Sequence, residues 1–341
     1  MSTYKEIRGL KVRDYTTNPD NPIEGQLWYN ETDNVAKYQA LTSTGSFATG
    51  GNLNSARDNI SGTGTQTAGL VTGGPGGSNG YTELYNGSSW TEAADLNTSR
   101  DSTSQGRAAT QTATIVWGGY PTYPGSYRTE TESWNGSAWT EVNDLSYGQA
   151  NGGAAGTSTS AIFGSGTVQP GNPFSGDFSP LSQSWNGTSW TTVSSVNNAR
   201  YGLNSSGGGA SNTSAIIYGG LGGPSPYTAK DFTETWNGSS WTEVNDMNTA
   251  RYSLTGTGAT ITAAIAFAGT IPGPPIKSEV EVWNGTSWSE DTDIPTASTN
   301  AGSGGTSSSA FVAGGNTGSD IANTFEWTGA GASVTKTIST D

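Results

Sequence analysis

The sequence predicts an all-β protein, a six-bladed β-propeller with a small N-terminal β-hairpin segment. The first observation behind this prediction is a repeat: an aromatic residue, Asn-Gly, two small residues and Trp recur at intervals of roughly 50 residues. The second is a short apolar run that ends on small residues and occurs six times, from Leu70–Gly74 to Phe311–Gly315. Four-stranded repeats of this length typically stack around an axis as the blades of a propeller.

Each repeat is expected to hold four strands. In one of them the strands are predicted at Tyr201–Ser206, Ile216–Gly220, Thr233–Trp236 and Trp241–Val244. The Asn-Gly pair between the last two favours a hairpin, because both residues tolerate the positive φ of a type I′ turn. Loops of two and of four residues both remain open, and either register places the two indoles on one face. The repeated tryptophans are therefore predicted to form blade core: Trp90, Trp134, Trp139, Trp185, Trp190, Trp236, Trp241, Trp283, Trp288 and Trp327.

The sixth repeat is degenerate, and its closing strand has two candidates. It contains Glu326-Trp327-Thr328-Gly329 in place of the full motif. Either Ser46–Gly50 or Ala332–Ile338 could supply the missing strand, and the first is favoured. The domains are accordingly predicted as residues 1–45, an attachment segment, and 46–341, the propeller.

Arginines recur at a fixed distance after the last aromatic residue of a repeat, while Gln149 and Ser298 depart from the pattern. These side chains could form an anion-binding ring. The favoured interpretation is that each lies between blades and donates to carbonyls or to Asp95, Asp246 or a nearby equivalent. The inter-blade residues are Arg57, Arg100, Arg200 and Arg251.

At this point the chain resembles the kelch-repeat family. The resemblance rests on the apolar strand ending in Gly-Gly, the aromatic residue before the turn, the Trp shortly after it and the following Arg, and it covers about residues 47–341. It implies the propeller fold. It says little about function, since kelch-like propellers serve both as enzymes and as adaptors.

The first 45 residues form a different unit. Gly25–Asn30 and Val35–Gln39 alternate around a turn, which predicts a hairpin. The stretch Pro22–Asn30, with Asp33 and Lys37, is similar to a short hairpin of virion structural proteins of tailed phages, tail fibres among them. That resemblance implies a virion protein made in the bacterial cytoplasm, attached to other virion proteins through residues 1–45, with a homo-oligomer as one option. Alternatively, the segment only caps the propeller.

Composition excludes several kinds of site. The net charge of −14 with only 14 scattered Lys and Arg disfavours nucleic acid as a partner. Neither His nor Cys occurs, so imidazole and thiolate metal sites, disulfides and Ser-His-Asp triads are excluded. No stretch is apolar enough over roughly 20 residues to cross a membrane. The acidic repeat positions Asp95, Asp144, Asp246 and Asp293 stand singly, unlike the alternating acids of a calcium loop. No metal and no cofactor are expected.

The sequence predicts that the protein is not an enzyme. It lacks the Asp-box pattern of sialidase-like hydrolases and the His and Cys ligands of kelch-type copper oxidases. No Asp or Glu conspicuously breaks the repeat, which argues against a glycosidase with two carboxylates. No catalytic residue is therefore assigned.

What breaks the repeat is the loop between the second and third strands, which is rich in aromatic residues. Loop insertions in repeat proteins often collect on a binding face. The leading hypothesis is a virion protein whose loops contact a host-surface glycan or protein. The alternatives are a purely structural capsid or tail decoration protein and a glycosidase acting on polysaccharide. An equally weighted interpretation of the loops is that their lengths vary without a function and that their aromatic residues pack against one another. The candidate binding residues are Tyr120, Tyr123, Tyr127, Phe174, Phe178 and Tyr227.

Overall fold

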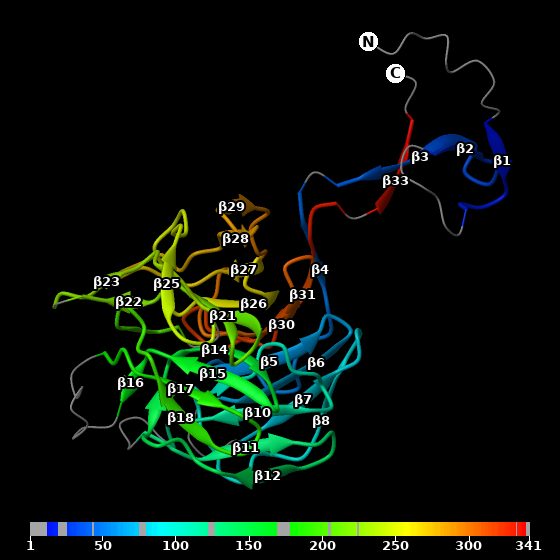
Figure 1. Cartoon of the computed structure of the whole chain (residues 1–341). Coiled ribbons are helices and arrows are strands. Elements are labelled where there is room, and N and C mark those ends of the chain that lie inside the picture. The colour runs from blue at the N-terminus through cyan, green and yellow to red at the C-terminus, as the bar shows by residue number, and fades with distance from the viewer. Residues whose placement is uncertain are drawn as a thin grey trace. The chain divides into compact units, whose positions relative to one another are not determined.

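A computed structural model describes residues 12–19, 26–42, 44–74, 80–121, 127–168, 178–203, 206–223, 225–331 and 333–338. The chain divides into two compact units. The small unit comprises Met1–Gly45 and Gly329–Asp341, and the large unit comprises Ser46–Thr328. Throughout the described ranges the regular elements are strands, and none is a helix long and apolar enough to cross a membrane (Figure 1). The all-β prediction is confirmed.

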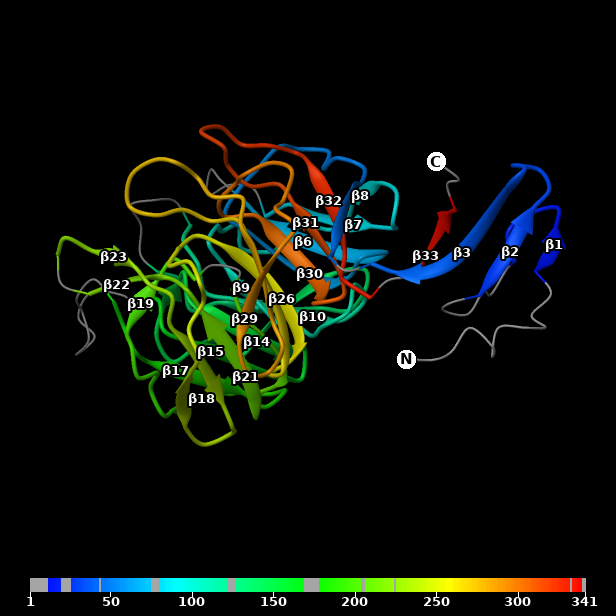
Figure 2. The same ribbon diagram turned by 90° about the horizontal axis from the view of Figure 1, so that it is seen from above.

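The large unit contains six four-stranded antiparallel sheets within the described residues (Figures 1 and 2). Sheet 1 holds β5 (Ile60–Thr65), β6 (Ala68–Gly73), β7 (Thr82–Tyr85) and β8 (Trp90–Glu92). Sheet 2 holds β9 (Ser104–Gln105), β10 (Thr114–Trp117), β11 (Thr131–Trp134) and β12 (Trp139–Val142). Sheet 3 holds β14 (Gly153–Thr157), β15 (Ser160–Gly164), β17 (Ser182–Trp185) and β18 (Trp190–Val193).

The remaining sheets follow the same order along the chain. Sheet 4 holds β20 (Gly208–Ser211), β21 (Ser214–Tyr218), β24 (Thr233–Trp236) and β25 (Trp241–Val244). Sheet 5 holds β26 (Thr255–Thr260), β27 (Ala263–Phe267), β28 (Val280–Trp283) and β29 (Trp288–Asp291). Sheet 6 holds β30 (Gly302–Thr306), β31 (Ser309–Ala313), β32 (Thr324–Thr328) and β4 (Ser46–Thr49). Two short ladders are separate from these sheets: β13 (Gln149–Ala150) with β16 (Thr167–Val168), and β19 (Arg200–Tyr201) with β22 (Leu221–Gly222) and β23 (Thr228–Ala229).

The turn between the third and fourth strands is a four-residue loop. Trp236 lies directly opposite Trp241 in the ladder, with ring centroids 5.4 Å apart. Only the glycine of the Asn-Gly pair has a positive φ, 96° at Gly238, so the type I′ turn is wrong. The side-chain oxygen of Asn237 accepts hydrogen bonds from the backbone N–H groups of Ser239 and Ser240 instead. Asn is therefore used here as a turn-closing acceptor.

The first strand of each repeat begins later than predicted. In sheet 4 it is β20 at Gly208–Ser211, whereas Tyr201 belongs to the separate ladder of β19. The backbone turns at Gly202, which has φ of 68°, and this bend prevents the strand from starting directly after the arginine.

The closing strand of sheet 6 is the favoured one of the two candidates. Strand β4 pairs antiparallel with β32, with Phe47 opposite Trp327. The other candidate forms β33 (Ser333–Thr337), which pairs with β3 (Val35–Leu41) in the small unit. The predicted domain boundary at residue 341 is therefore wrong at this end, because Gly329–Asp341 belongs with the small unit.

The small unit is one four-stranded sheet in the order β1 (Arg13–Tyr15), β2 (Leu27–Asn30), β3 and β33. The predicted hairpin corresponds to β2 and β3, which pair from Leu27 opposite Tyr38 to Asn30 opposite Val35. Trp28 is fully buried in this unit.

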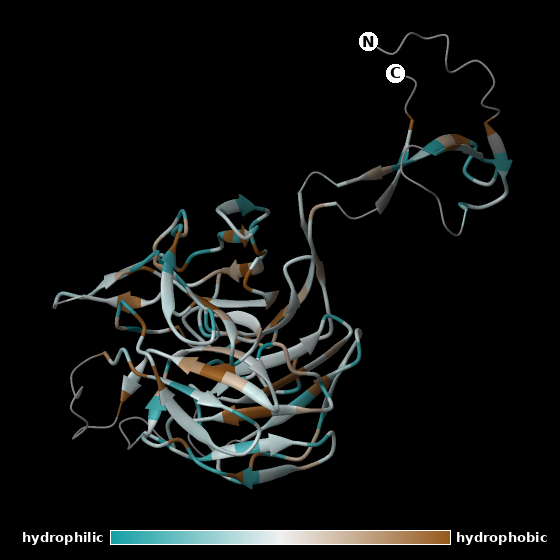
Figure 3. Ribbon diagram, in the orientation of Figure 1, coloured by the Kyte–Doolittle hydropathy of each residue, from teal (hydrophilic) through white to brown (hydrophobic). Residues whose placement is uncertain are grey.

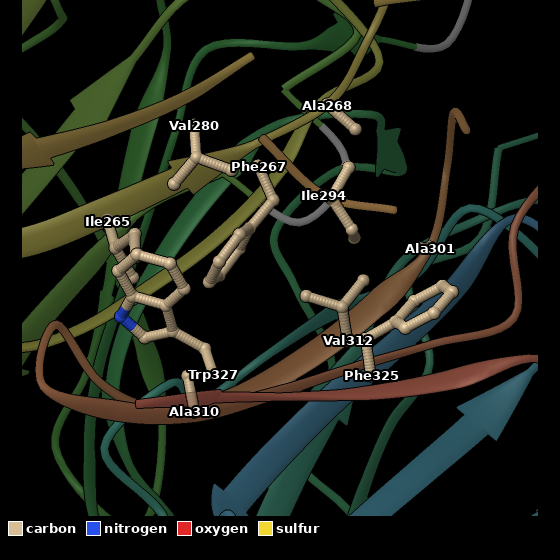
Figure 4. Packing of buried hydrophobic residues seen from close by; sticks show 10 residues of the cluster. All are labelled: Ile265, Phe267, Ala268, Val280, Ile294, Ala301, Ala310, Val312, Phe325 and Trp327. Atoms are coloured by element: carbon tan, nitrogen blue, oxygen red, sulfur yellow. The ribbon is translucent and has the colours of Figure 1, made fainter. Parts of the chain in front are cut away.

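The core of the large unit lies between neighbouring sheets. Hydrophobic stretches coincide with second strands such as β10 and β15 (Figure 3). In the cluster of Figure 4, Trp327 of sheet 6 packs against Ile265 and Phe267 of sheet 5. The ten tryptophans predicted as core are all buried, the most exposed being Trp190 at 7%.

The six sheets contact one another through their first strands. Neighbours in the order β5, β9, β14, β20, β26 and β30 lie side by side, and β30 also lies beside β5. Each fourth-strand Trp donates its indole N–H to a hydroxyl on the third strand of the preceding sheet. These bonds are Trp139 to Thr82, Trp190 to Thr131, Trp241 to Ser182, Trp288 to Thr233, and Trp90 to Thr324.

Candidate functional site

The four repeated arginines form buried ion pairs at the sheet connections. Each guanidinium contacts a glutamate on the third strand of the sheet that follows, at 2.6 Å for Arg200 and Glu234 and at 3.2 Å for Arg100 and Glu132. Asp95 and Asp246, the two expected acidic partners, are therefore wrong. The expected donation to backbone carbonyls is confirmed for Arg200, which donates to Gly219 and Asn198, and for Arg251, which donates to Glu279. Burial lowers the pKa of the Arg200 guanidinium, and Glu234 opposes that shift. The full set of pairs is Arg57–Glu83, Arg100–Glu132, Arg200–Glu234 and Arg251–Glu281.

An asparagine completes each of these four clusters. The backbone N–H and side-chain amide of Asn197 both donate to Glu234, and the amide also donates to the carbonyl of Trp241. Asn54, Asn97 and Asn248 make the same contacts with Glu83, Glu132 and Glu281. The guanidinium groups are thus committed to glutamate, and the anion-binding alternative loses its support.

The two repeats that lack the arginine change all three positions together. In sheet 3, Gln149 takes the place of Arg and accepts a hydrogen bond of 3.1 Å from Gln183, which takes the place of Glu. The N–H of Ser146, at the asparagine position, donates to Gln183. In sheet 6 the three positions are occupied by Ser298, Phe325 and Pro295. A neutral pair or an apolar group thus replaces both buried charges at once, because one charge alone would remain unpaired.

Two residues beyond each arginine position, the backbone adopts a left-handed conformation. Such φ values are uncommon outside glycine and are best tolerated by Asn and other small polar residues. We call these six residues the mouth ring: Asn59 (φ 51°), Ser102 (50°), Asn151 (58°), Gly202 (68°), Ser253 (52°) and Asn300 (58°).

Backbone hydrogen bonds join the mouth ring from one sheet connection to the next. The N–H of Ser102 donates to the carbonyl of Asn59 at 3.0 Å, and Asn151 donates to Ser102 at 3.5 Å. On the other side, Ser253 donates to Gly202 at 2.7 Å and Asn300 donates to Ser253 at 2.9 Å. The left-handed bends therefore direct backbone groups of these connections toward their neighbours, and the six residues surround a common space.

That space is a cavity of about 350 Å³, near the lower end of the range of small-molecule sites. Its lining is polar and partly aromatic. It consists of the mouth ring together with Asp101, Tyr120 and Tyr201. We call this cavity the mouth pocket.

Local pairing places Tyr120 beside Asp101. The two residues form a bridge in which each backbone N–H donates to the other's carbonyl, at 2.9 and 3.0 Å. The Tyr120 hydroxyl accepts a hydrogen bond from the amide of Asn151 at 3.0 Å and lies 3.2 Å from the Thr167 hydroxyl. Burial raises the pKa of Tyr120, so its phenol stays protonated.

A second aromatic group supports Tyr201. The ring of Phe178 stacks on Tyr201 with centroids 5.1 Å apart, and Tyr227 meets Phe178 edge-on at 4.8 Å. Among the six candidate loop residues, Tyr120 lines the mouth pocket and Tyr127 packs on Tyr120 at 4.8 Å. Phe178 and Tyr227 lie behind Tyr201, and Tyr123 and Phe174 lie outside the described residues. Of the four candidate loop residues that the structure describes, Tyr120 is thus the one in the lining of the mouth pocket.

Sequence reasoning missed most of the lining. A signal existed, because aligning the repeats on the arginine position places all six mouth-ring residues in one column. The position directly after the arginine is also informative, because its residue type differs from repeat to repeat. It reads Asp58, Asp101, Ala150, Tyr201, Tyr252 and Thr299.

Two acids therefore do break the repeat, contrary to the prediction. Burial raises the pKa of Asp58 to about 6, with a further contribution from Asp320. Burial also raises the pKa of Asp101. The connections entering sheets 1 and 2 thus carry acids, whereas those entering sheets 4 and 5 carry tyrosines at the same position.

Within the described ranges, no group of three or more acidic side chains is arranged to hold a metal ion. Comparison with protein-family models finds no matching family, and comparison with curated proteins finds no match. The chemistry of the mouth pocket is consequently the basis for assigning a function.

Proposed function

We propose that the large unit is a closed, six-bladed, kelch-like β-propeller that binds a carbohydrate at the mouth pocket and catalyses no reaction. Closure is supported by the cyclic order of the first strands, in which β30 lies beside β5. It is also supported by the Trp90–Thr324 hydrogen bond, which joins sheets 1 and 6 in the way that consecutive sheets are joined. Six equivalent connections then meet at one end of the ring.

The observation that carries the binding proposal is the composition of the pocket lining. Three asparagines and two serines of the mouth ring, whose side chains end in amide and hydroxyl groups, belong to the lining of one cavity. Such groups both donate and accept, as the hydroxyl groups of a sugar do. Tyr120 and Tyr201 supply apolar ring surface for the C–H groups of a sugar ring. A small polar cavity with aromatic walls suits a saccharide better than an extended protein surface.

We further propose that the small unit attaches the protein to a phage virion and that the ligand is a host-surface glycan. The support is the hairpin resemblance of Pro22–Asn30 together with the separate compact sheet formed by β1, β2, β3 and β33. The purely structural alternative requires no ligand. The glycosidase alternative gains one supporting observation, since Asp58 and Asp101 are acids with raised pKa at the mouth.

A glycan array tests the proposal. The variant Asn151→Gly keeps the left-handed bend, because Gly202 occupies the equivalent position, and removes one amide from the lining. Tyr201→Ala removes one aromatic wall. Both variants are expected to lose most binding, on the order of tenfold or more.

The matched control is Asn34→Gly, which makes the same change at a left-handed residue of the small unit, φ 55°, and is expected to bind as the wild type does. Unchanged binding in both pocket variants would remove the assigned site. Release of reducing sugar from host polysaccharide, abolished by Asp58→Asn or Asp101→Asn, would favour the glycosidase instead.

A further inference from the structure

The charge in the described lining of the mouth pocket is negative. Asp101 is the one charged side chain in its described lining, and no Lys or Arg belongs to that lining. The repeated cations that precede Asp58 and Asp101 in the chain, Arg57 and Arg100, are buried and paired with Glu83 and Glu132. A ligand in the pocket would therefore meet a carboxylate without meeting a compensating cation.

Other acidic groups add to the negative electrostatic potential around Asp101. Asp58 occupies the equivalent position in the preceding connection and interacts electrostatically with both Asp101 and Asp320. The whole chain carries a net charge of −14. An anionic ligand would be repelled both at long range and in the pocket, while a cation would be attracted.

The aromatic lining is compatible with the same preference. Tyr120 is held next to Asp101 by their backbone bridge, and Tyr201 contributes to the same cavity. Tyrosine rings attract cations through their negative faces. A protonated amine in this space could donate to Asp101 and to the amide oxygens of the mouth ring while contacting a tyrosine ring.

We propose that the mouth pocket prefers sugars carrying a protonated amino group over the corresponding neutral and carboxylated sugars. This inference rests on the carbohydrate binding proposed above and specifies the class of ligand. The carboxylate of Asp101 is the group that distinguishes the three forms, and the mouth-ring asparagines contact hydroxyls common to all of them.

The test uses the full chain and nine small probes. These are the methyl glycosides of glucose, galactose and mannose, each with a hydroxymethyl, an aminomethyl or a carboxylate group at the same ring carbon. Dissociation constants are measured at pH 7 by ligand-observed NMR titration. For at least one sugar, the amine is expected to bind about tenfold more tightly than the hydroxymethyl form, as a hydrogen bond to a charged group allows. The carboxylate is expected to bind most weakly.

Two variants separate the pocket from the overall charge of the protein. Asp101→Asn has almost the same shape and should reduce the preference for the amine over the neutral sugar to about twofold or less. Glu290→Gln makes the same change of charge at an exposed position of β29 and should keep the preference. Thermal unfolding of both variants verifies that they are folded.

The outcomes distinguish the two proposals. If the neutral sugars bind as tightly as the amines, or if Asp101→Asn retains the full preference, the inference is overturned while carbohydrate binding stands. If none of the nine probes binds the wild type, both proposals are overturned.

Discussion

The indole nitrogen of Trp90 donates a hydrogen bond to the hydroxyl of Thr324, 2.9 Å away, although Trp90 lies in the first repeat and Thr324 in the last. We call the contact region between two neighbouring sheets a seam. Four other seams contain the same hydrogen bond between an indole and a hydroxyl. At the remaining seam Phe47 and Val280 stand at the two positions and belong to one hydrophobic cluster. Donor and acceptor are thus both kept or both replaced, since either one alone would leave a buried polar group unpaired.

This pattern predicts a measurable coupling across a seam. Trp139→Phe removes the indole donor to the Thr82 hydroxyl, which keeps its hydrogen bond of 3.1 Å with the Thr72 hydroxyl, so this variant should cost about 1 kcal/mol. Thr82→Val leaves the Trp139 N–H without its acceptor and should cost about 1–3 kcal/mol. The double variant resembles the Phe47–Val280 seam and should cost less than the sum by roughly 1 kcal/mol. Free energies of unfolding in urea provide the measurement. Combining Trp139→Phe with Thr233→Val, whose partner is Trp288, should give simple additivity.

The buried Arg100–Glu132 pair predicts a stronger coupling. Arg100→Gln or Glu132→Gln alone leaves one buried charge unpaired and should destabilise the fold by about 3–5 kcal/mol. The double variant reproduces the Gln149–Gln183 pair of sheet 3 and should recover much of that loss. Thermal or urea unfolding of all three proteins checks this. A double variant no more stable than the sum of the singles would contradict the compensation.

Asp58 predicts a dependence of stability on pH. Its pKa in the folded protein is about 6, above the ordinary 3.8, so the folded state binds the proton more tightly than the unfolded state does. The stability contributed by protonated Asp58 is therefore present below pH 4 and is lost as the pH rises through about 6. Asp58→Asn should unfold at a higher temperature than the wild type at pH 7, and this difference should disappear near pH 4. Glu290→Gln, at an exposed position of β29, is the control for the loss of one negative charge.

The hydrogen bonds of Arg107 to the first strands predict that removing this donor lowers the stability of the large unit. This side chain follows β9 of sheet 2, is 1% exposed, and donates to the carbonyls of Gly62 in β5 and Ser303 in β30 at 2.7 and 3.4 Å. Arg107→Met keeps an unbranched apolar stem but removes the donor, and should destabilise the large unit by roughly 1–3 kcal/mol. Arg107→Lys retains a cation and should fall between Met and the wild type. Hydrogen exchange at β5 and β30 would locate the effect, which is expected to be greatest there.

Residues close together in the sequence were sufficient to predict the hairpins of the third and fourth strands. The third and fourth strands of sheet 4 were predicted residue for residue, because Asn-Gly and the flanking tryptophans lie close together in the chain. The carbonyl acceptors of Arg200 and Arg251 agree with the prediction, but the carboxylate partners do not, because an arginine and its glutamate, such as Arg57 and Glu83, lie in different elements. Loop length indicates Tyr120 but not the short polar residues that complete the lining, so the sequence pattern does not predict the mouth pocket.

The amino-acid sequence by itself determined the repeat, the burial of the tryptophans and the all-β class, because these follow from spacing and from side chains that interact within one hairpin. Only the tertiary structure decided which terminal strand completes sheet 6, which carboxylate neutralises each arginine, and where six left-handed residues come together. Those relationships join residues from different repeats, often far apart along the chain. Their physical origin is packing between sheets, which depends on how the backbone bends at each connection and cannot be read from neighbours in the sequence.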